Sequence, residues 1–259
     1  MDLSCMKKCL LVNKSLHIEP VGSWISPIIL SDCVHIEKNS LRCILFRSRH
    51  NQVFVGFRCL RFSCTDMVNT QSMLRKRRIY GGGYVHSCFL SMLDDIFDRV
   101  QKWVLRHMTR NDIVYVTGHG VAGAIAVLCA ERFACLQYRP EIYTFGAPKV
   151  GDITFASRFG HIPFFRFVLD TDIIPLFPLS GDYVHAGQCL YIDRKHRLKE
   201  SVRPWKMFLV EWFHKVCGCI LFDENQYHCF SRYEESLEEC IMDDCGIDDH
   251  NIEDTKIVV

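Results

Sequence analysis

The pentapeptide Gly118-His119-Gly120-Val121-Ala122 has the form of a nucleophile elbow, except that glycine stands at its centre. A turn of the form G-x-S-x-G joins a strand to a helix and raises its central residue above a sheet. Backbone N–H groups at the start of the helix can then hold an oxyanion. The sequence therefore keeps the position of a nucleophile, but the residue that fills it has no oxygen or sulfur for acyl transfer.

Glycine suits the centre of such a turn, because it tolerates the strained, positive-φ backbone expected there. A glycine-bearing turn between a strand and a helix can also cradle a phosphate. A phosphate-binding loop would require a Lys-Ser or Lys-Thr pair after its last glycine, whereas Ala124-Ile125 follow Gly123. Nucleotide binding is therefore disfavoured.

Alternating strands and helices are expected to position the turn. The segment DIVYVTG before it is typical of a buried strand, and residues 120–136 of an apolar helix. We also expect two strands within 43–58, an amphipathic helix over 89–108, and strands at EIYTFGA and FFRFVLD. This order predicts an α/β fold with a mostly parallel sheet and helices on both faces.

The composition favours one large domain. Its charges nearly cancel, so the chain has no strong overall electrostatic field. The chain has 259 residues, 49% of them hydrophobic, with 31 basic and 30 acidic side chains. We expect a single domain over residues 1–237 and an acidic, mobile tail over residues 238–259. The near-neutral charge does not point to a nucleic-acid partner.

The 15 cysteines lie mostly singly among apolar neighbours and lack paired metal-ligand spacing. We therefore expect no metal and no other cofactor. The apolar stretch after the first lysines is only four residues long, far shorter than a signal-peptide core, which favours the cytoplasm.

Two apolar segments approach the length of a membrane span. Residues 113–130 carry no charge, but their glycines and histidine fit a strand-turn-helix better. Glu211 and Lys215 interrupt residues 207–222, which favours a buried or a membrane-touching amphipathic segment. No transmembrane helix is predicted.

Several segments in order between residues 53 and 237 resemble the class 3, or fungal-type, lipase family. The elbow segment VTGHGVAGAIA is one of them. The others are VFVGFRCLRFSCTD, YVHSCF, YTFGAPKVGD, FVLDTDIIPLFP, YVHAGQ and DENQYHCFSRYEESL. One such segment would be weak evidence, but this many in the same order are specific. The resemblance implies a fold of the α/β-hydrolase type.

The resemblance also implies roles for individual residues. Asp172 takes the place of the family's orienting aspartate, and His228 that of its general base, which accepts the proton of the nucleophile. A strand-end cap for Asp172 and an ordinary histidine for His228 are the alternatives. The Val121 backbone N–H is the expected oxyanion donor. The resemblance further implies structural roles at the site for five residues: Gly118, His119, Gly123, His86 and His185.

Departures from the family's motifs affect two parts of the acyl-transfer apparatus. Gly120 stands at the position of the nucleophile, and Leu60 replaces the hydroxyl residue that helps to bind the oxyanion. Cys59 and Cys88 replace glycines in flanking motifs. We therefore expect a pseudoenzyme whose cleft still accommodates an acyl lipid, an ester or a protein partner.

Two other interpretations remain open. The first is an active esterase that uses a non-standard nucleophile or water activated by a His228–Asp172 dyad. Thr117, His119, Ser87 and Cys88 lie near the elbow, although we expect Thr117 within the strand and His119 to point away from the cleft. The second is a protein-interaction module that uses the acidic tail or the basic run RKRR at 75–78. Near a lid, that run could also make peripheral contact with anionic lipid head groups.

Overall fold

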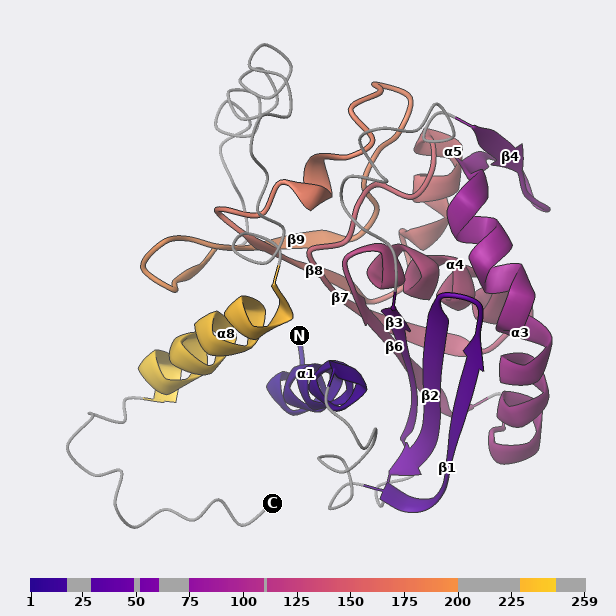
Figure 1. Ribbon diagram of the computed structural model, residues 1–259, viewed down its shortest axis with the longest axis horizontal. Coiled ribbons are helices and arrows are strands. Elements are labelled where there is room, and N and C mark those ends of the chain that lie inside the picture. Colours follow the sequence, from indigo (N-terminus) through magenta and orange to yellow (C-terminus); the bar gives the residue numbers. More distant parts are fainter. Residues whose placement is uncertain (18–28, 49–51, 61–74, 110, 200–228, 246–259) are drawn as a thin grey trace.

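Five neighbouring parallel strands form the centre of an eight-stranded sheet with the order β1-β2-β3-β6-β7-β8-β9-β10 (Figure 1). The computed structural model describes residues 1–17, 29–48, 52–60, 75–109, 111–199 and 229–245. The parallel strands are rich in apolar residues because helices cover both of their faces. They are β3 (Val53–Cys59), β6 (Ile113–His119), β7 (Arg139–Phe145), β8 (Phe164–Leu169) and β9 (Gln188–Ile192).

Antiparallel strands extend the sheet at both edges. On one side, β2 (Leu41–Ser48) pairs with β3, and β1 (Ile29–Lys38) pairs with β2. On the other side, β10 (Leu198–Lys199) pairs with the end of β9. A separate two-stranded sheet contains β4 (Lys76–Arg78) and β5 (Tyr84–His86). The expected α/β class is thus confirmed, whereas β1 was not predicted.

Helices pack on both faces of the sheet and enclose two hydrophobic cores (Figure 1). The helices α3 (Ser87–His107), α4 (Val121–Cys135) and α5 (Ile153–Ala156) cover one face. The other face is covered by α1 (Leu3–His17) and α8 (Phe230–Cys245). The expected helices over 89–108 and 120–136 correspond to α3 and α4.

The uncharged run 113–130 divides into β6 and the buried helix α4, as expected. Within the described ranges, no helix has both the length and the apolar character needed to cross a membrane. The segment 207–222 lies outside the described residues. The expected boundary between the domain and the acidic tail, after residue 237, stays a prediction. The helix α8 runs across this position.

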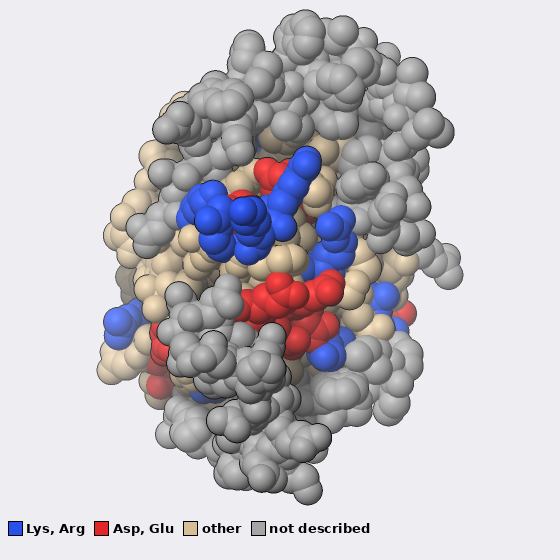
Figure 2. Space-filling model, turned by 90° about the vertical axis from the view of Figure 1, so that its left-hand side faces the viewer, with Lys and Arg blue, Asp and Glu red and all other residues tan. Residues whose placement is uncertain are grey.

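The face that carries α8 and the β9–β10 turn shows basic and acidic side chains in adjacent groups (Figure 2). Exposed basic residues on this turn are Arg194, Lys195 and Arg197, and Lys199 is exposed on the adjoining β10. Exposed acidic side chains on α8 include Glu235, Glu238 and Glu239. This face therefore has no field of a single sign.

Candidate functional site

A sharp turn at Gly120 connects β6 to α4. Gly120 has φ 57° and ψ −130°, and its N–H donates to the Phe145 carbonyl oxygen at 2.8 Å. Its own carbonyl oxygen accepts from the Gly123 N–H at 2.9 Å, which closes the first turn of the helix. The positive φ explains why glycine fits here, since a larger residue would be strained.

Glycines at both edges of the turn allow the strand and the helix to approach closely. A Cβ atom at Gly118 would lie 2.5 Å from the Ala122 carbonyl oxygen. One at Gly123 would lie 2.8 Å from the Ala147 Cβ and 2.9 Å from the Gly118 carbonyl oxygen. Steric crowding therefore explains why the sequence has glycine at both Gly118 and Gly123.

Two oxyanion positions were expected, at Val121 and Leu60. Val121 is the first residue of α4, so its N–H has no acceptor within the helix and is available to an anion. Leu60 follows β3 at the same edge of the sheet, but its side chain has no donor. Its N–H already donates to the Ser40 carbonyl oxygen at 2.8 Å. The Leu60 side of the site thus offers neither a side-chain nor a free backbone donor.

Asp172 is buried just beyond the end of β8, with 5% of its surface exposed. Its Oδ1 accepts from the Ile174 N–H at 2.9 Å, and its Oδ2 accepts from the Tyr233 hydroxyl at 2.6 Å. The Tyr233 oxygen in turn accepts from the Leu169 N–H at 3.2 Å. Burial, followed by the charge of Asp172, raises the pKa of Tyr233 well above its usual range, so this hydroxyl stays a donor to the carboxylate.

Tyr233 was not identified from the sequence. It lies in the segment DENQYHCFSRYEESL, for which the sequence predicts a functional role only for His228. The spacing of Phe230, Tyr233 and Leu237 places all three on the buried face of α8, and this spacing was the available signal. His228 itself lies outside the described residues, two positions before α8 begins, so its distances to Asp172 and Gly120 stay predictions.

The three supporting histidines occupy different surroundings. The His119 ring lies 5.6 Å from those of Phe230 and Tyr233, toward the helices α1 and α8. His86 is buried, and its ring stacks on Phe89 at 4.1 Å. The His185 Nε2 lies 2.7 Å from the Pro175 carbonyl oxygen. Burial, and secondarily Arg166, lower the pKa of His185 well below its ordinary value, so it ties down the loop after Asp172 as a neutral donor.

Thr117 and Cys88, two of the candidates near the elbow, are poorly suited to replace the missing nucleophile. Thr117 is fully buried within β6, and its Oγ1 accepts from the Asn13 Nδ2 at 2.7 Å. Cys88 is half-buried near the start of α3, and burial raises the pKa of its thiol. A raised pKa leaves less thiolate at neutral pH.

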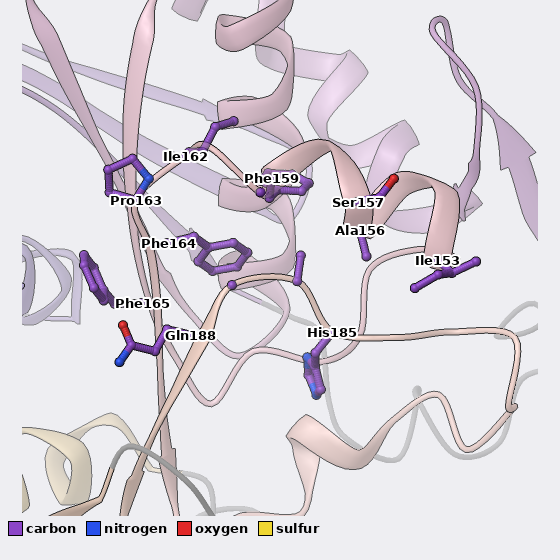
Figure 3. Close-up of a pocket in the computed structure, with 13 residues that line it drawn as sticks. Ile153, Ala156, Ser157, Phe159, Ile162, Pro163, Phe164, Phe165, His185 and Gln188 are labelled. Carbon is purple, nitrogen blue, oxygen red and sulfur yellow. The ribbon is translucent and has the colours of Figure 1, made fainter.

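An open pocket of about 520 Å³ lies elsewhere, beside the first residues of β8 and β9 (Figure 3). Its apolar side chains include Ile153, Phe159, Ile162 and Phe164, and its polar ones include His185 and Gln188. Asp172 and the elbow follow the opposite, carboxyl ends of the strands. This pocket is therefore distinct from the candidate catalytic cleft. Among the described residues, no group of three or more His, Cys, Asp or Glu side chains is arranged to hold a metal ion.

Comparison with protein families gives one matching model, described as lipase (class 3), over residues 45–181. Lipase ZK262.3 of Caenorhabditis elegans is 34% identical over 134 residues, which are 49% of this chain and 38% of that protein. A lipase of Rhizopus niveus is 35% identical over 147 residues, or 52% and 36% of the two chains. The matches therefore span little more than a third of the length of these relatives.

Solved structures share the architecture. Lipase II from Rhizopus niveus has a TM-score of 0.60 at 21% identity, and the match covers 74% of this chain and 82% of that chain. The Rhizomucor miehei triacylglyceride lipase has a TM-score of 0.57 at 22% identity, with coverages of 73% and 79%. At these identities the likeness establishes the fold alone.

Proposed function

This chain belongs to the class 3 lipase family, and we propose that it is a catalytically impaired member whose cleft binds an acyl lipid or ester without forming an acyl-enzyme. The observation that carries the proposal is the absence of a side chain at Gly120, the position from which a nucleophile would attack. The backbone geometry of the elbow is retained there, with φ 57° and ψ −130°.

A triad works because a histidine takes the proton of a hydroxyl while a carboxylate fixes the histidine tautomer and stabilises the imidazolium. Asp172 retains the surroundings of such a carboxylate, since it is buried and accepts from the Ile174 N–H and the Tyr233 hydroxyl. Without an oxygen at Gly120, this arrangement can orient His228 but cannot acylate the protein.

Loss of an oxyanion donor lowers activity further. The Val121 N–H remains as a donor, whereas the Leu60 N–H is engaged by Ser40 and the Leu60 side chain is apolar. Removing one such donor typically slows acyl transfer by about a hundred-fold to a thousand-fold. Two separate defects thus support binding without turnover.

The retained Asp172 environment also favours a second candidate, an esterase in which His228 and Asp172 activate water directly. Deleting the nucleophile of a triad can leave a residual enhancement of roughly a thousand-fold over water, most of it from oxyanion binding and substrate positioning. Because the Leu60 side of the site lacks a donor, we expect this residual rate to be small.

A third candidate is an interaction module that uses exposed charges. All three residues of β4 are basic and exposed, and two of them form ion pairs, Lys76 with Asp182 and Arg77 with Asp94. Tyr80, at the turn that follows, is 94% exposed. Basic and aromatic side chains together suit peripheral contact with anionic lipid head groups.

We also propose a cytoplasmic location. The support comes from the sequence, in which most of the 15 cysteines lie singly among apolar neighbours, as free thiols do in a reducing compartment.

Ester hydrolysis separates the first two candidates. We expect the wild-type protein to hydrolyse short- and long-chain p-nitrophenyl esters no faster than the His228→Ala variant, because neither has an acylating oxygen. Saturable binding of a fluorescent long-chain acyl amide is expected in both. A wild-type rate that disappears in His228→Ala would instead favour activated water, and failure of both proteins to bind the probe would favour the interaction module.

A further inference from the structure

Arg166 is a buried cation on β8 that no described carboxylate neutralises. Only 8% of its surface is exposed, and its Nε has no hydrogen-bond partner within the described part of the chain. Arginine is rarely buried to this extent unless it is paired. Burial lowers the pKa of the Arg166 guanidinium, and the neighbouring Cys189 side chain opposes this shift. The site is therefore suited to a nearby anion.

Strand register brings Cys189 beside Arg166. The two residues are partners on the parallel strands β8 and β9. Phe165 and Phe167 face the core under α1 and α8, so Arg166, which lies between them in the sequence, faces the opposite side. Leu190 also faces the core under α1 and α8, which places its neighbour Cys189 on the same side as Arg166.

Cys189 is accessible to small reagents. It is half-buried on β9, and β10 pairs only with Tyr191 and Ile192 among the described residues of that strand. Cys189 therefore pairs with β8 and with no described residue of β10. The preceding residue, Gln188, lines the open pocket of Figure 3.

Eight of the other ten described thiols lie in less favourable surroundings for anion formation. Burial raises the pKa of these eight: Cys5, Cys9, Cys33, Cys43, Cys59, Cys88, Cys129 and Cys135. These thiols are consequently less available as the thiolate, which is the nucleophilic form.

Cys135 is an informative internal comparison, because it also contacts an arginine. The Arg158 Nη2 donates to the Cys135 Sγ at 3.1 Å, but Arg158 also pairs with Glu131. The Cys135 thiol donates to the Glu131 Oε1 at 3.1 Å, and this carboxylate adds to the effect of burial in raising the pKa of Cys135. Contact with an arginine is thus insufficient when a carboxylate already neutralises it.

We propose that Cys189 is a modification site, which reacts with hydroperoxides and soft alkylating electrophiles faster than the eight thiols named above, and that Arg166 promotes this reaction by stabilising the sulfur anion. The thiol proton leaves to solvent, and the sulfur attacks one oxygen of the peroxide. The O–O bond breaks, the sulfur is oxidised to a sulfenic acid, and the displaced hydroxide or alkoxide takes a proton from water. This reaction is independent of the ester cleft.

Competitive alkylation of the folded full chain tests the proposal. Brief exposure to light iodoacetamide between pH 6 and 9 is followed by denaturation, heavy iodoacetamide, digestion and mass spectrometry of each cysteine. We expect Cys189 to react at least about ten-fold faster than Cys135. A Cys189 rate no greater than that of Cys135 would overturn the proposal.

Arginine variants distinguish stabilisation of the anion from simple exposure. Arg166→Gln should slow the alkylation of Cys189 by about ten-fold, whereas Arg166→Lys, which keeps the positive charge, should retain most of the wild-type rate. Arg158→Gln, the matched control, should leave the Cys189 rate unchanged. If Arg166→Gln unfolds the protein, Arg166→Met, which also removes the charge, takes its place and should slow Cys189 equally. An unaltered Cys189 rate in a folded variant that lacks the charge would overturn the role of Arg166.

Discussion

Asp172 keeps both of its carboxylate oxygens hydrogen-bonded, although no hydroxyl stands at Gly120 to be activated. On the proposed assignment of Asp172 as the orienting carboxylate, the surroundings of this residue persist at the scale of single residues without the nucleophile that it would serve. Tyr233 links the carboxylate to α8, and its oxygen also accepts from the Leu169 N–H. This tyrosine thus stabilises the fold as well as the site.

Tyr233→Phe should lower the free energy of unfolding by about 1 to 3 kcal/mol, because it leaves the Asp172 Oδ2 and the Leu169 N–H without this partner in a buried place. Tyr183→Phe is the matched control, since the buried Tyr183 hydroxyl has no hydrogen-bond partner among the described residues. We expect that control to be neutral or stabilising. Urea denaturation measures both variants, and equal losses of stability would contradict the role assigned to the Tyr233 hydroxyl.

Sequence alone could identify some residues of the site and not others. Gly120 and Leu60 were found because motif positions held the wrong residue types. The bond from the Leu60 N–H to Ser40 and the link from Tyr233 to Asp172 were not found, because each joins residues from different elements. The juxtaposition of Arg166 and Cys189 likewise depends on strand register, which the sequence pattern did not define.

At the scale of elements, α3 and α4 were predictable and α1 and β1 were not. The helix α3 has a regular apolar stripe, and α4 is almost entirely apolar. The buried residues of α1 include Asn13 and Ser15, whose side chains donate to the Cys9 and Val12 carbonyl oxygens. Buried polar residues obscure the apolar period. Two irregularities in the pairing of β1 with β2 similarly weaken its alternation.

The contact between α1 and β3 has little spare room. A Cβ atom at Gly56 would lie 2.4 Å from the Val12 Cγ1 and 3.1 Å from the Ile44 Cγ2. Gly56→Ala should therefore destabilise the protein by about 1 to 3 kcal/mol through overpacking. Gly181→Ala is the control, because no atom lies within 4 Å of the added Cβ.

A double-mutant cycle with Val12→Ala assigns this cost to the helix contact. Removing the Val12 methyl groups makes space, so the double variant should be more stable than the sum of the single effects predicts, by about 0.5 kcal/mol or more. Thermal denaturation of all four proteins gives the coupling. Strict additivity would show that α1 does not set the requirement for glycine at residue 56.

At the scale of the whole molecule, the carboxyl ends of β3, β6 and β8 bring Leu60, Gly120 and Asp172 to one edge of the sheet. The sequence predicted this arrangement through the order of its motifs, since the fold follows from the alternation of strands and helices. The pocket beside the first residues of β8 and β9 was not predicted, because it forms between segments that the motifs do not connect.

Restoring the missing groups should restore acylation if the rest of the cleft is preserved. Gly120→Ser supplies the oxygen, and adding Leu60→Thr supplies a side-chain donor worth roughly 3 to 4 kcal/mol to an oxyanion. The serine must adopt the positive φ that glycine takes freely, so we expect a loss of stability on the order of 1 kcal/mol.

Covalent labelling by a fluorophosphonate, located by mass spectrometry, tests the central claim most directly. The account predicts no label at the elbow of the wild-type protein, and label on the introduced serine of the folded Gly120→Ser/Leu60→Thr variant. Adding His228→Ala to that variant should abolish the label. A folded double variant that takes up no label, or a wild-type protein labelled as fast at another cleft residue, would contradict the claim that the missing oxygen at Gly120 is what disables this site.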